Sequence, residues 1–374
     1  MLSGTRPLSI RERLAGLASW DRAGGDLASG GLAGEDLVLE GPTGAGLDGP
    51  GDRYGNDSVV ATLEERVAAL LGKPAAVFFP TGTMAQQVAL RCWAQVSGSP
   101  VVAMHPLGHL EVHERHAYAT LSGLRAVWPT QERRPPTAAE VRDLDEPFGT
   151  LLLELPLRDA GYLLPTWDEL VSVVGAARER GARVHFDGAR LWESTVYLGQ
   201  DLPTIAALAD SVYVSFYKSL DGMAGAAVAG SAEFVGQARA WRHRYGGNVF
   251  QQWPAALSAL TGLTTVLPHL PSYVAHAGEV AGALAQLPGA IVYPNPPHTH
   301  QFQLWLPYPA EALNEAGLVM AEQDKVWFAG RFVDQPPTGL AMTEVTVADP
   351  ALTWSAEDIV AAGEMFLDRV SALS

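Results

Sequence analysis

The sequence predicts an α/β protein in which a large domain with a mainly parallel, doubly wound sheet precedes a smaller α+β domain. Strand-like apolar runs alternate with helical patterns from residue 53 to residue 267, which is typical of parallel strands joined by helices. From about Pro268 the pattern changes to helix, strand, loop and strand. The 374 residues are 48% hydrophobic and 18% charged, enough for a large core and a smaller one. We therefore expect domains at 53–267 and 268–374 after an amino-terminal segment, 1–52.

Composition disfavours several classes of partner. The formal charge of −16 disfavours nucleic acid and anionic membranes, because both require clustered Lys and Arg. Residues 1–9 lack the apolar segment of a signal peptide, and no apolar run long enough to span a membrane occurs, so we expect a cytoplasmic protein without a membrane partner. The single cysteine, Cys92, suits a reducing compartment, and its apolar helical surroundings indicate core packing. A small metabolite is the expected partner.

The first 52 residues combine a predicted helix, Ile10–Trp20, with a glycine-dense segment from Ala23 to Gly51. Glycine gives the backbone conformational freedom and lets it approach other groups closely. We therefore expect either a flexible arm or a segment wrapped against another surface.

Hydrophobic periodicity predicts the other elements. An amphipathic helix places Leu63, Val67, Leu70 and Leu71 on one face. The expected strands are Ala75–Phe79, Thr150–Leu155, Arg183–Asp187, Val212–Tyr217, Ala290–Tyr293 and Gln301–Leu306. The expected helices are Met84–Trp93, Ala138–Leu144, Trp167–Arg180, Leu202–Ala209 and Tyr273–Leu287. Ligands of a doubly wound sheet bind at the carboxyl ends of its strands, so site residues are expected there.

Lys218 follows the strand Val212–Tyr217 and precedes a turn and a strand of small residues. It is the only lysine between Lys73 and Lys325. Poor hydration in such a place lowers the pKa of an amine toward neutrality, which is what imine chemistry requires. A solvated turn is the alternative interpretation.

Asp187 ends the strand that precedes the lysine strand, and Arg190 lies just beyond it. A carboxylate at the carboxyl end of a strand can keep the ring nitrogen of a pyridinium protonated. Asp187 alone could equally be a helix cap. On successive strands, Asp187 and Lys218 together predict a site for pyridoxal phosphate.

The turn Pro80–Thr83 joins a predicted strand to a predicted helix. The backbone amides and the dipole at a helix amino terminus attract anions. We therefore place the phosphate of the cofactor at Gly82 and Thr83, although the same residues also suit an ordinary strand-to-helix turn.

Residues 105–116 contain four histidines and two glutamates. The spacing of His109 and His113 would put two metal ligands on one helical face. Pro106 and Gly108 break the first turn, however, no thiol lies nearby, and neither glutamate completes a metal motif. We therefore expect no metal.

Three blocks, Pro80–Ala85, His185–Arg190 and Ser215–Lys218, resemble blocks of the L-threonine aldolase and beta-eliminating lyase family in the same order. The similarity runs from about Asp52 to about Leu257. The family consists of fold type I enzymes that use pyridoxal 5'-phosphate, so the resemblance implies this fold and this cofactor. It also implies a homodimer or homotetramer, because the family shares its active sites between subunits.

The resemblance assigns roles to several side chains. His109 would stack on the pyridine ring, with Glu114 in the following helix. The residues expected to act in catalysis are Lys218, His109 and Asp187. Those expected to bind the cofactor are Gly82, Thr83, His109, Asp187, Arg190, Ser215 and Lys218. Arg190 and Arg331 are expected to bind the amino acid substrate.

The sequence departs from the family near the substrate. The early Ser-Asp-Thr block is not found, and Leu155 and Leu157 stand where Asn and His are expected. Arg158 or Asp159 would have to replace the missing acid/base group. His298 and His300 are expected to be exposed loop residues, with a contribution to the pocket as the alternative.

Two arginines of the family are also replaced. Phe250 stands where an arginine reaches the phosphate of the neighbouring subunit, so Arg242 or Arg244 would substitute unless both are solvated helix charges. Thr343 stands where an arginine binds the substrate carboxylate, which is why Arg331 or Arg190 is expected to do so.

These features predict a carbon–carbon lyase that cleaves a β-hydroxy-α-amino acid to glycine and an aldehyde. Because each departure removes a polar group, we expect an apolar pocket that favours side chains larger than that of threonine, as in phenylserine. The alternatives are another reaction such as β-elimination, or a non-catalytic relative that retains the fold. A nicotinamide enzyme is disfavoured because no Gly-x-Gly-x-x-Gly follows the first strand.

Overall fold

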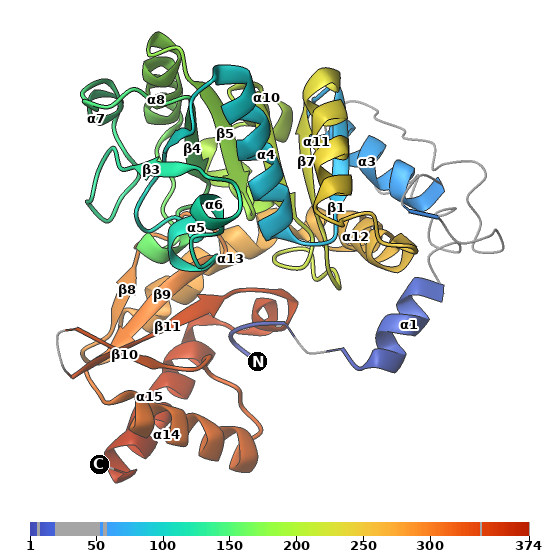
Figure 1. Ribbon diagram of the computed structural model, residues 1–374. Coiled ribbons are helices and arrows are strands. Elements are labelled where there is room, and N and C mark those ends of the chain that lie inside the picture. Colours follow the sequence, from blue (N-terminus) through green and yellow to red (C-terminus); the bar gives the residue numbers. More distant parts are fainter. Residues whose placement is uncertain (6–7, 19–52, 55–57, 337–338, 374) are drawn as a thin grey trace.

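The computed structural model describes residues 1–5, 8–18, 53–54, 58–336 and 339–373, which form two β-sheets (Figure 1). The strands of the larger sheet are β1 (Ala75–Phe79), β2 (Val101–Ala103), β3 (Arg125–Val127), β4 (Thr150–Glu154), β5 (Arg183–Gly188), β6 (Ser211–Ser215) and β7 (Ala226–Gly230). Those of the smaller sheet are β8 (Ile291–Tyr293), β9 (Gln301–Leu306), β10 (Val333–Gln335) and β11 (Leu340–Thr346). The helices are α1 (Ile10–Ala18), α3 (Ser58–Leu70), α4 (Gly82–Ser97), α5 (His109–Val112), α6 (Ala117–Thr120), α7 (Ala138–Arg142), α8 (Trp167–Glu179), α9 (Thr195–Leu198), α10 (Leu202–Ala207), α11 (Ala232–Arg244), α12 (Trp253–Thr265), α13 (Leu270–Leu284), α14 (Ala310–Gln323) and α15 (Ala356–Leu373). Short 3₁₀ helices are η2 (Arg158–Ala160), η3 (Leu191–Glu193), η4 (Leu267–His269) and η5 (Asp349–Thr353).

The strands of the larger sheet lie in the order β1-β7-β6-β5-β4-β2-β3. β7 runs antiparallel to both of its neighbours, β1 and β6. The other neighbouring pairs are parallel. The expected mainly parallel sheet is therefore confirmed.

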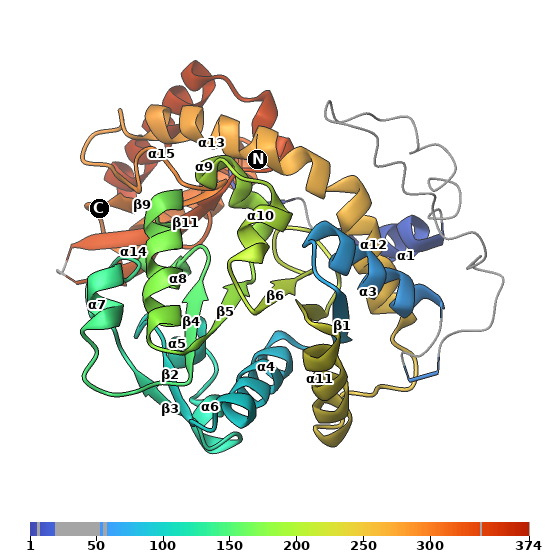
Figure 2. The same cartoon turned by 90° about the horizontal axis from the view of Figure 1, so that it is seen from above.

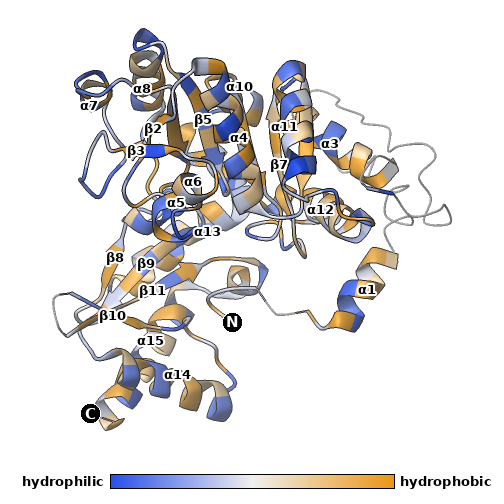
Figure 3. Ribbon diagram, viewed as in Figure 1, coloured by the Kyte–Doolittle hydropathy of each residue, from blue (hydrophilic) through white to orange (hydrophobic). Residues whose placement is uncertain are grey.

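Helices cover both faces of the larger sheet (Figure 2). Side chains along β1 alternate between the two faces: Val77 and Phe79 pack with α4 and α11, whereas Ala76 and Phe78 belong to the core that contains α3, α8 and α12. Figure 3 shows apolar residues along the strands and polar residues on the outer sides of the helices. Burial on both faces explains why these strands are almost continuously apolar.

The smaller sheet is antiparallel, in the order β10-β11-β9-β8, and packs with α13, α14 and α15. α13 contributes to both cores, because Leu270 and Tyr273 pack in the core of the larger sheet and Ala277 packs in that of the smaller one. The start of the chain also packs here. Leu2 is buried in this second core, and its backbone N–H donates to the carbonyl of Trp327 at 3.0 Å.

Most of the expected elements are confirmed, with differences of a few residues at their ends. The strands Ala75–Phe79 and Gln301–Leu306 agree at both ends. Sequence periodicity does not predict β2 or β3, because three residues are too few to show it. The glycine-dense segment lies outside the described residues, and a domain boundary at residue 268 stays a prediction. None of the described helices combines the length and the apolarity that a membrane crossing requires.

Cys92 of α4 and Arg242 of α11 are both buried. Cys92 is packed in the core beneath α4, as expected, and burial raises the pKa of its thiol to about 12. Of the two interpretations of Arg242, that of a solvated helix charge is wrong, and its role as a substitute for the phosphate arginine stays a prediction. Its guanidinium is buried and donates to the carbonyl of Phe78 at 2.7 Å and to the side chain of Asn248 at 3.0 Å. Arg242 therefore ties α11 to the end of β1, while Arg244 is exposed.

Candidate active site

Lys218 lies in the bend that follows β6, at the carboxyl end of the parallel strands. The N–H of Gly222 donates to the carbonyl of Phe216 at 2.8 Å and closes this bend. Only glycine fits there, since a Cβ at this position would lie 2.6 Å from that carbonyl oxygen. Burial and the charge of Arg190 lower the pKa of Lys218, and the charge of Asp187 opposes them. A lowered pKa leaves more of the amine uncharged, and the uncharged amine is the nucleophilic form.

Asp187 lies on β5 directly beside Glu154, its partner at the end of β4. Asp187 is buried, and burial raises the pKa of its carboxyl group against the opposing charges of Lys218 and His109. Burial and the charge of Asp187 raise the pKa of Glu154 to about 7. The Glu154 carboxylate accepts the backbone N–H of His109 at 2.8 Å. Glu154 is not among the predicted site residues, although a carboxylate at the end of an apolar strand is a usable signal.

The Glu154→Gln variant is expected to show a weaker pH dependence of stability between about pH 4.5 and 7. In this window the folded protein keeps a proton on Glu154 that the unfolded chain releases, so stability falls as the pH rises, by at most about 1.4 kcal/mol per pH unit. Thermal unfolding of the cofactor-free protein across this range measures the slope. An identical slope in the variant would show that Glu154 has an ordinary pKa.

His109 is the first residue of α5, and its Nδ1 lies 3.4 Å from Oε1 of the buried Glu114. The amide of Gln87 donates to the other oxygen of Glu114 at 3.1 Å and fixes it. Burial lowers the pKa of His109, but the hydrogen bond with Glu114 and the charge of Asp187 outweigh burial and raise it. The described residues contain no group of three or more His, Cys, Asp or Glu side chains placed to hold a metal. The arrangement instead orients the imidazole beside Asp187.

The start of α4 lies against β6. Gly82 contacts the hydroxyl of Tyr213 so closely that a Cβ would clash with it. Thr81 caps the helix by accepting the N–H of Met84 at 3.3 Å. Ser215 lies on the same face of β6 as Tyr213, because side chains two residues apart share a face. Its hydroxyl is buried and has no hydrogen-bond partner among the described residues. A helix amino terminus and an unpaired hydroxyl together suit an anion.

A cationic cluster borders Lys218. The guanidinium of Arg190 lies 5.3 Å from the ring centre of the fully buried Tyr162. Arg158 donates to Glu344 of the smaller sheet at 2.7 Å. Burial, Arg190 and Arg158 all lower the pKa of Lys218. The Nε atoms of both arginines and the Tyr162 hydroxyl are buried without a hydrogen-bond partner among the described residues, which suits a bound carboxylate.

Other expected site residues lie elsewhere. Arg331 is exposed in the segment before β10 and lines an open groove with Leu318 and Trp327, and no described contact joins it to the lysine cluster. The expectation of exposure is wrong for His300, which directly precedes β9 and is buried, with its ring stacked on Tyr273 of α13. His298 is half-buried and stays outside the lysine cluster.

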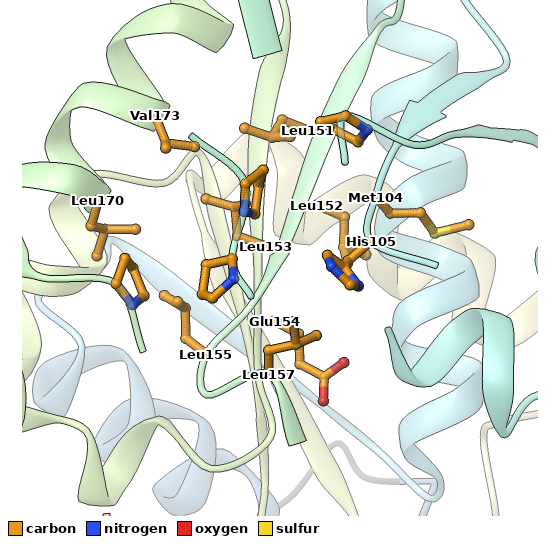
Figure 4. A pocket seen from close by; sticks show the side chains of 14 residues that line it. Met104, His105, Leu151, Leu152, Leu153, Glu154, Leu155, Leu157, Leu170 and Val173 are labelled. Carbon is orange, nitrogen blue, oxygen red and sulfur yellow. The ribbon is translucent and has the colours of Figure 1, made fainter. Parts of the chain in front are cut away.

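Leu155 and Leu157 do not open a wide apolar pocket. Both are buried, and they line a cavity of about 20 Å³ between β4 and α8, in which Glu154 is the one carboxylate among the described lining residues (Figure 4). Such a volume holds about one water molecule. The cavity that these two leucines line therefore has no room for the side chain of a substrate.

The chemistry of these groups fits pyridoxal phosphate. Lys218 supplies an amine of lowered pKa, and Asp187 supplies a buried carboxylate for a ring nitrogen. The helix start at Gly82 and the unpaired hydroxyl of Ser215 supply an anion site. Arg190 supplies a cation with an unpaired donor. The described residues therefore offer an amine for the aldehyde of the cofactor, a carboxylate for its ring nitrogen and an anion site for its phosphate.

Comparisons with known proteins agree with this chemistry. The family described as beta-eliminating lyase matches residues 47–305. The chain is 29% identical to low-specificity L-threonine aldolase 1 of Arabidopsis thaliana over 251 residues, which are 64% of this chain and 69% of that protein.

Solved structures extend the similarity to nearly the whole chain. A Listeria monocytogenes structure described as an L-allo-threonine aldolase superposes with a TM-score of 0.86 and 30% identity, covering 98% of this chain and 95% of that one. An Exiguobacterium structure described as an aromatic amino acid beta-eliminating lyase/threonine aldolase gives a TM-score of 0.85 and 32% identity, with 98% and 96% covered. The chain therefore belongs to the beta-eliminating lyase family, and it is a pyridoxal phosphate-dependent lyase of the threonine aldolase type with the type I fold.

Proposed function

We propose that this protein is an aldolase that cleaves a β-hydroxy-α-amino acid between Cα and Cβ to give glycine and an aldehyde. The observation that carries the proposal is the placement of Lys218 and Asp187 at the ends of adjacent strands, with His109 beside them. The Arabidopsis and Listeria relatives named threonine aldolases, with 29% and 30% sequence identity, support the same reaction.

When bound, pyridoxal phosphate supplies an electron sink for the bond that breaks at Cα. Asp187 would keep the ring nitrogen protonated, because its buried charge favours a proton on a neighbouring base. Lys218 would hold the cofactor through its amine, and the same amine, with its lowered pKa, would take up and return protons. His109, held by Glu114, would lie against the ring.

The other roles follow from the unpaired donors. Gly82, Thr83 and Ser215 would hold the phosphate at the start of α4. Arg190 would bind the substrate carboxylate beside Lys218, since the Nε of Arg190 has no partner among the described residues. Binding of the substrate carboxylate by Arg331 also stays a prediction, because no described contact joins Arg331 to the site.

We also propose that this enzyme favours side chains larger than that of threonine. The resemblance places Leu157 and Thr343 where polar groups would contact a small hydroxy amino acid, and Phe250 where an arginine would reach the phosphate. Leu157 packs in an apolar cluster with Leu163, so it cannot bind a hydroxyl group. The name of the Exiguobacterium relative includes an aromatic amino acid lyase, which agrees with this preference.

Cleavage of phenylserine and threonine, measured side by side, tests both proposals. We expect a specificity constant at least about tenfold higher for phenylserine, because the larger side chain gains about 1–3 kcal/mol per buried methylene-sized group. Benzaldehyde and glycine should form in equal amounts. Ammonia and a keto acid would instead indicate β-elimination. An equal or higher specificity constant for threonine would refute the preference.

We further propose a homodimer or homotetramer with its active sites at the interface. Ile10 and Leu14 of α1 are 80% and 61% exposed, and Arg13 on the same helix donates to Asp221 in the lysine bend at 3.0 Å. The exposed apolar residues therefore adjoin the segment of Lys218. Obligate interfaces usually bury more than about 2,000 Å². Light scattering at micromolar concentration should give at least a dimer. An active, cofactor-loaded monomer would contradict the proposal.

A further inference from the structure

A buried polar chain connects the smaller sheet to the segment that carries Lys218. Its members are Ser219, Glu193 at the end of η3, and His300, the residue before β9. Glu193 is 0% exposed and His300 is 3% exposed. The Ser219 hydroxyl donates to Oε1 of Glu193 at 2.6 Å, and Nε2 of His300 lies 3.6 Å from the same oxygen. The chain therefore ends one residue from the reactive amine.

The short helix η3 holds the lysine segment on both sides. Trp192 donates its indole N–H to the carbonyl of Ser215 at 3.1 Å. The next residue, Glu193, accepts the hydroxyl of Ser219. Lys218 lies between these two anchored residues. η3 begins three residues after the end of β5, so the segment that anchors the lysine bend follows the strand that carries the buried Asp187.

The ring of His300 is fixed by groups around the smaller sheet. Its Nδ1 lies 2.9 Å from the carbonyl of Val347, which only accepts, so Nδ1 carries a hydrogen. The ring stacks on Tyr273 with centroids 6.0 Å apart, and Tyr273 donates to Asp349 at 2.6 Å. Nε2 of His300 and Oε2 of Glu193 have no hydrogen-bond partner among the described residues. A buried carboxylate with so few partners depends strongly on those it has.

We propose that Glu193 and His300 are positioning residues for Lys218 and act on it through Ser219. They hold the amine where the cofactor must meet it, and they make its position depend on the smaller sheet. A displacement between the two sheets changes the contact of His300 with Glu193 and reaches Lys218 through Ser219. The inference rests on the proposed attachment of the cofactor to Lys218.

Cofactor binding to the cofactor-free protein tests this role without any turnover. Ser219→Ala keeps Lys218 but removes the hydroxyl that binds Glu193. We expect about tenfold weaker binding of pyridoxal phosphate and an altered visible circular dichroism of the bound cofactor, because a hydrogen bond to a charged group is lost. The cofactor-free variant should also be somewhat less stable, because the buried Glu193 carboxylate loses a partner, so binding is measured well below its unfolding temperature.

Two substitutions of Glu193 distinguish the effect of its hydrogen bonds on cofactor affinity from the effect of its size. Glu193→Gln keeps an acceptor for Ser219 and adds a donor toward His300, so its cofactor affinity should stay near that of the parent. Glu193→Met has a similar size and should match Ser219→Ala. The double variant of Glu193→Met with Ser219→Ala should bind no more weakly than either single variant, because both changes remove the same contact.

His300→Asn tests the link to the smaller sheet. The asparagine amide can still donate to Val347, but nothing replaces Nε2. We expect several-fold weaker binding when Glu193 is present and no further loss in the Glu193→Met background. His276→Asn is the matched control, because His276 forms a partly exposed pair with Glu279 at 3.2 Å on α13.

Two results would overturn the inference: cofactor binding by Ser219→Ala as tight as by the His276→Asn control, or losses that add in the double variant. Attachment of the cofactor to another lysine would instead refute the proposed role of Lys218. Borohydride labelling reports that attachment independently of the binding constants, so the two failures are distinguishable.

Discussion

Lys218→Ala is expected to lower kcat/KM for cleavage of a β-hydroxy amino acid by at least about 10³-fold. The variant loses both the attachment point and the amine of lowered pKa beside Asp187. Its fold should survive, because burial disfavours the charged form of Lys218 and the substitution removes that cost. Steady-state kinetics and thermal unfolding of the cofactor-free protein check the two halves of this prediction.

Borohydride reduction followed by peptide mass spectrometry tests the same assignment directly. We expect the pyridoxyl group on Lys218. Lys73 donates to the carbonyl of Ala209 at 2.7 Å, and Lys325 donates to the carbonyl of Glu322 at 2.7 Å, so both serve structural contacts. Lys325→Ala is the control and should retain parental activity. A label on Lys73 or Lys325 would refute the assignment.

The groups that strand order brings together could be predicted from the sequence. Lys218 follows one apolar run and Asp187 ends the preceding one, and parallel neighbours place such ends at one edge of a sheet. Glu154 satisfies the same rule on β4. Its position at the end of β4 could not be predicted, because the apolar run continues into Leu155 and the predicted strand ends there. The direction of β7 also follows from the sequence, since residues 216–225 are too few for the crossover of a dozen or more residues that a parallel strand needs.

Contacts between loops that are distant in the sequence could not be predicted. His300 stands in a segment rich in proline, which has no periodicity and resembles an exposed loop. It is buried because tertiary contacts bring it to Tyr273 of α13, the carbonyl of Val347 and Glu193 of η3. Arg242 is a similar case: only the packing of α11 on the larger sheet places its guanidinium at the carbonyl of Phe78. Burial of a polar side chain depends on tertiary partners that local composition does not encode.

Asp187→Asn is expected to lower kcat/KM by about 10²- to 10³-fold and to leave the cofactor-free protein at least as stable as the parent. Asparagine has the same shape, and its carbonyl can still accept the N–H of Ala189, which donates to Asp187 at 3.2 Å. Burial raises the pKa of Asp187, so the folded protein holds this charge at a cost that asparagine removes. A merely structural carboxylate would give a loss of stability instead. Kinetics and thermal unfolding at pH 7 decide between the two.

The same substitution should lower the pKa of His109, because the charge of Asp187 helps to raise it against the effect of burial. An NMR titration of His109 in the cofactor-free protein measures this shift without any reaction. Asp210→Asn is the control: Asp210 accepts the N–H of Val184 at 2.8 Å near the amino end of the strands, so its loss should leave His109 unchanged. If His109 titrates identically in Asp187→Asn and turnover persists, Asp187 does not act on the group that reacts, and the pairing of Asp187 with the ring nitrogen of the cofactor is wrong.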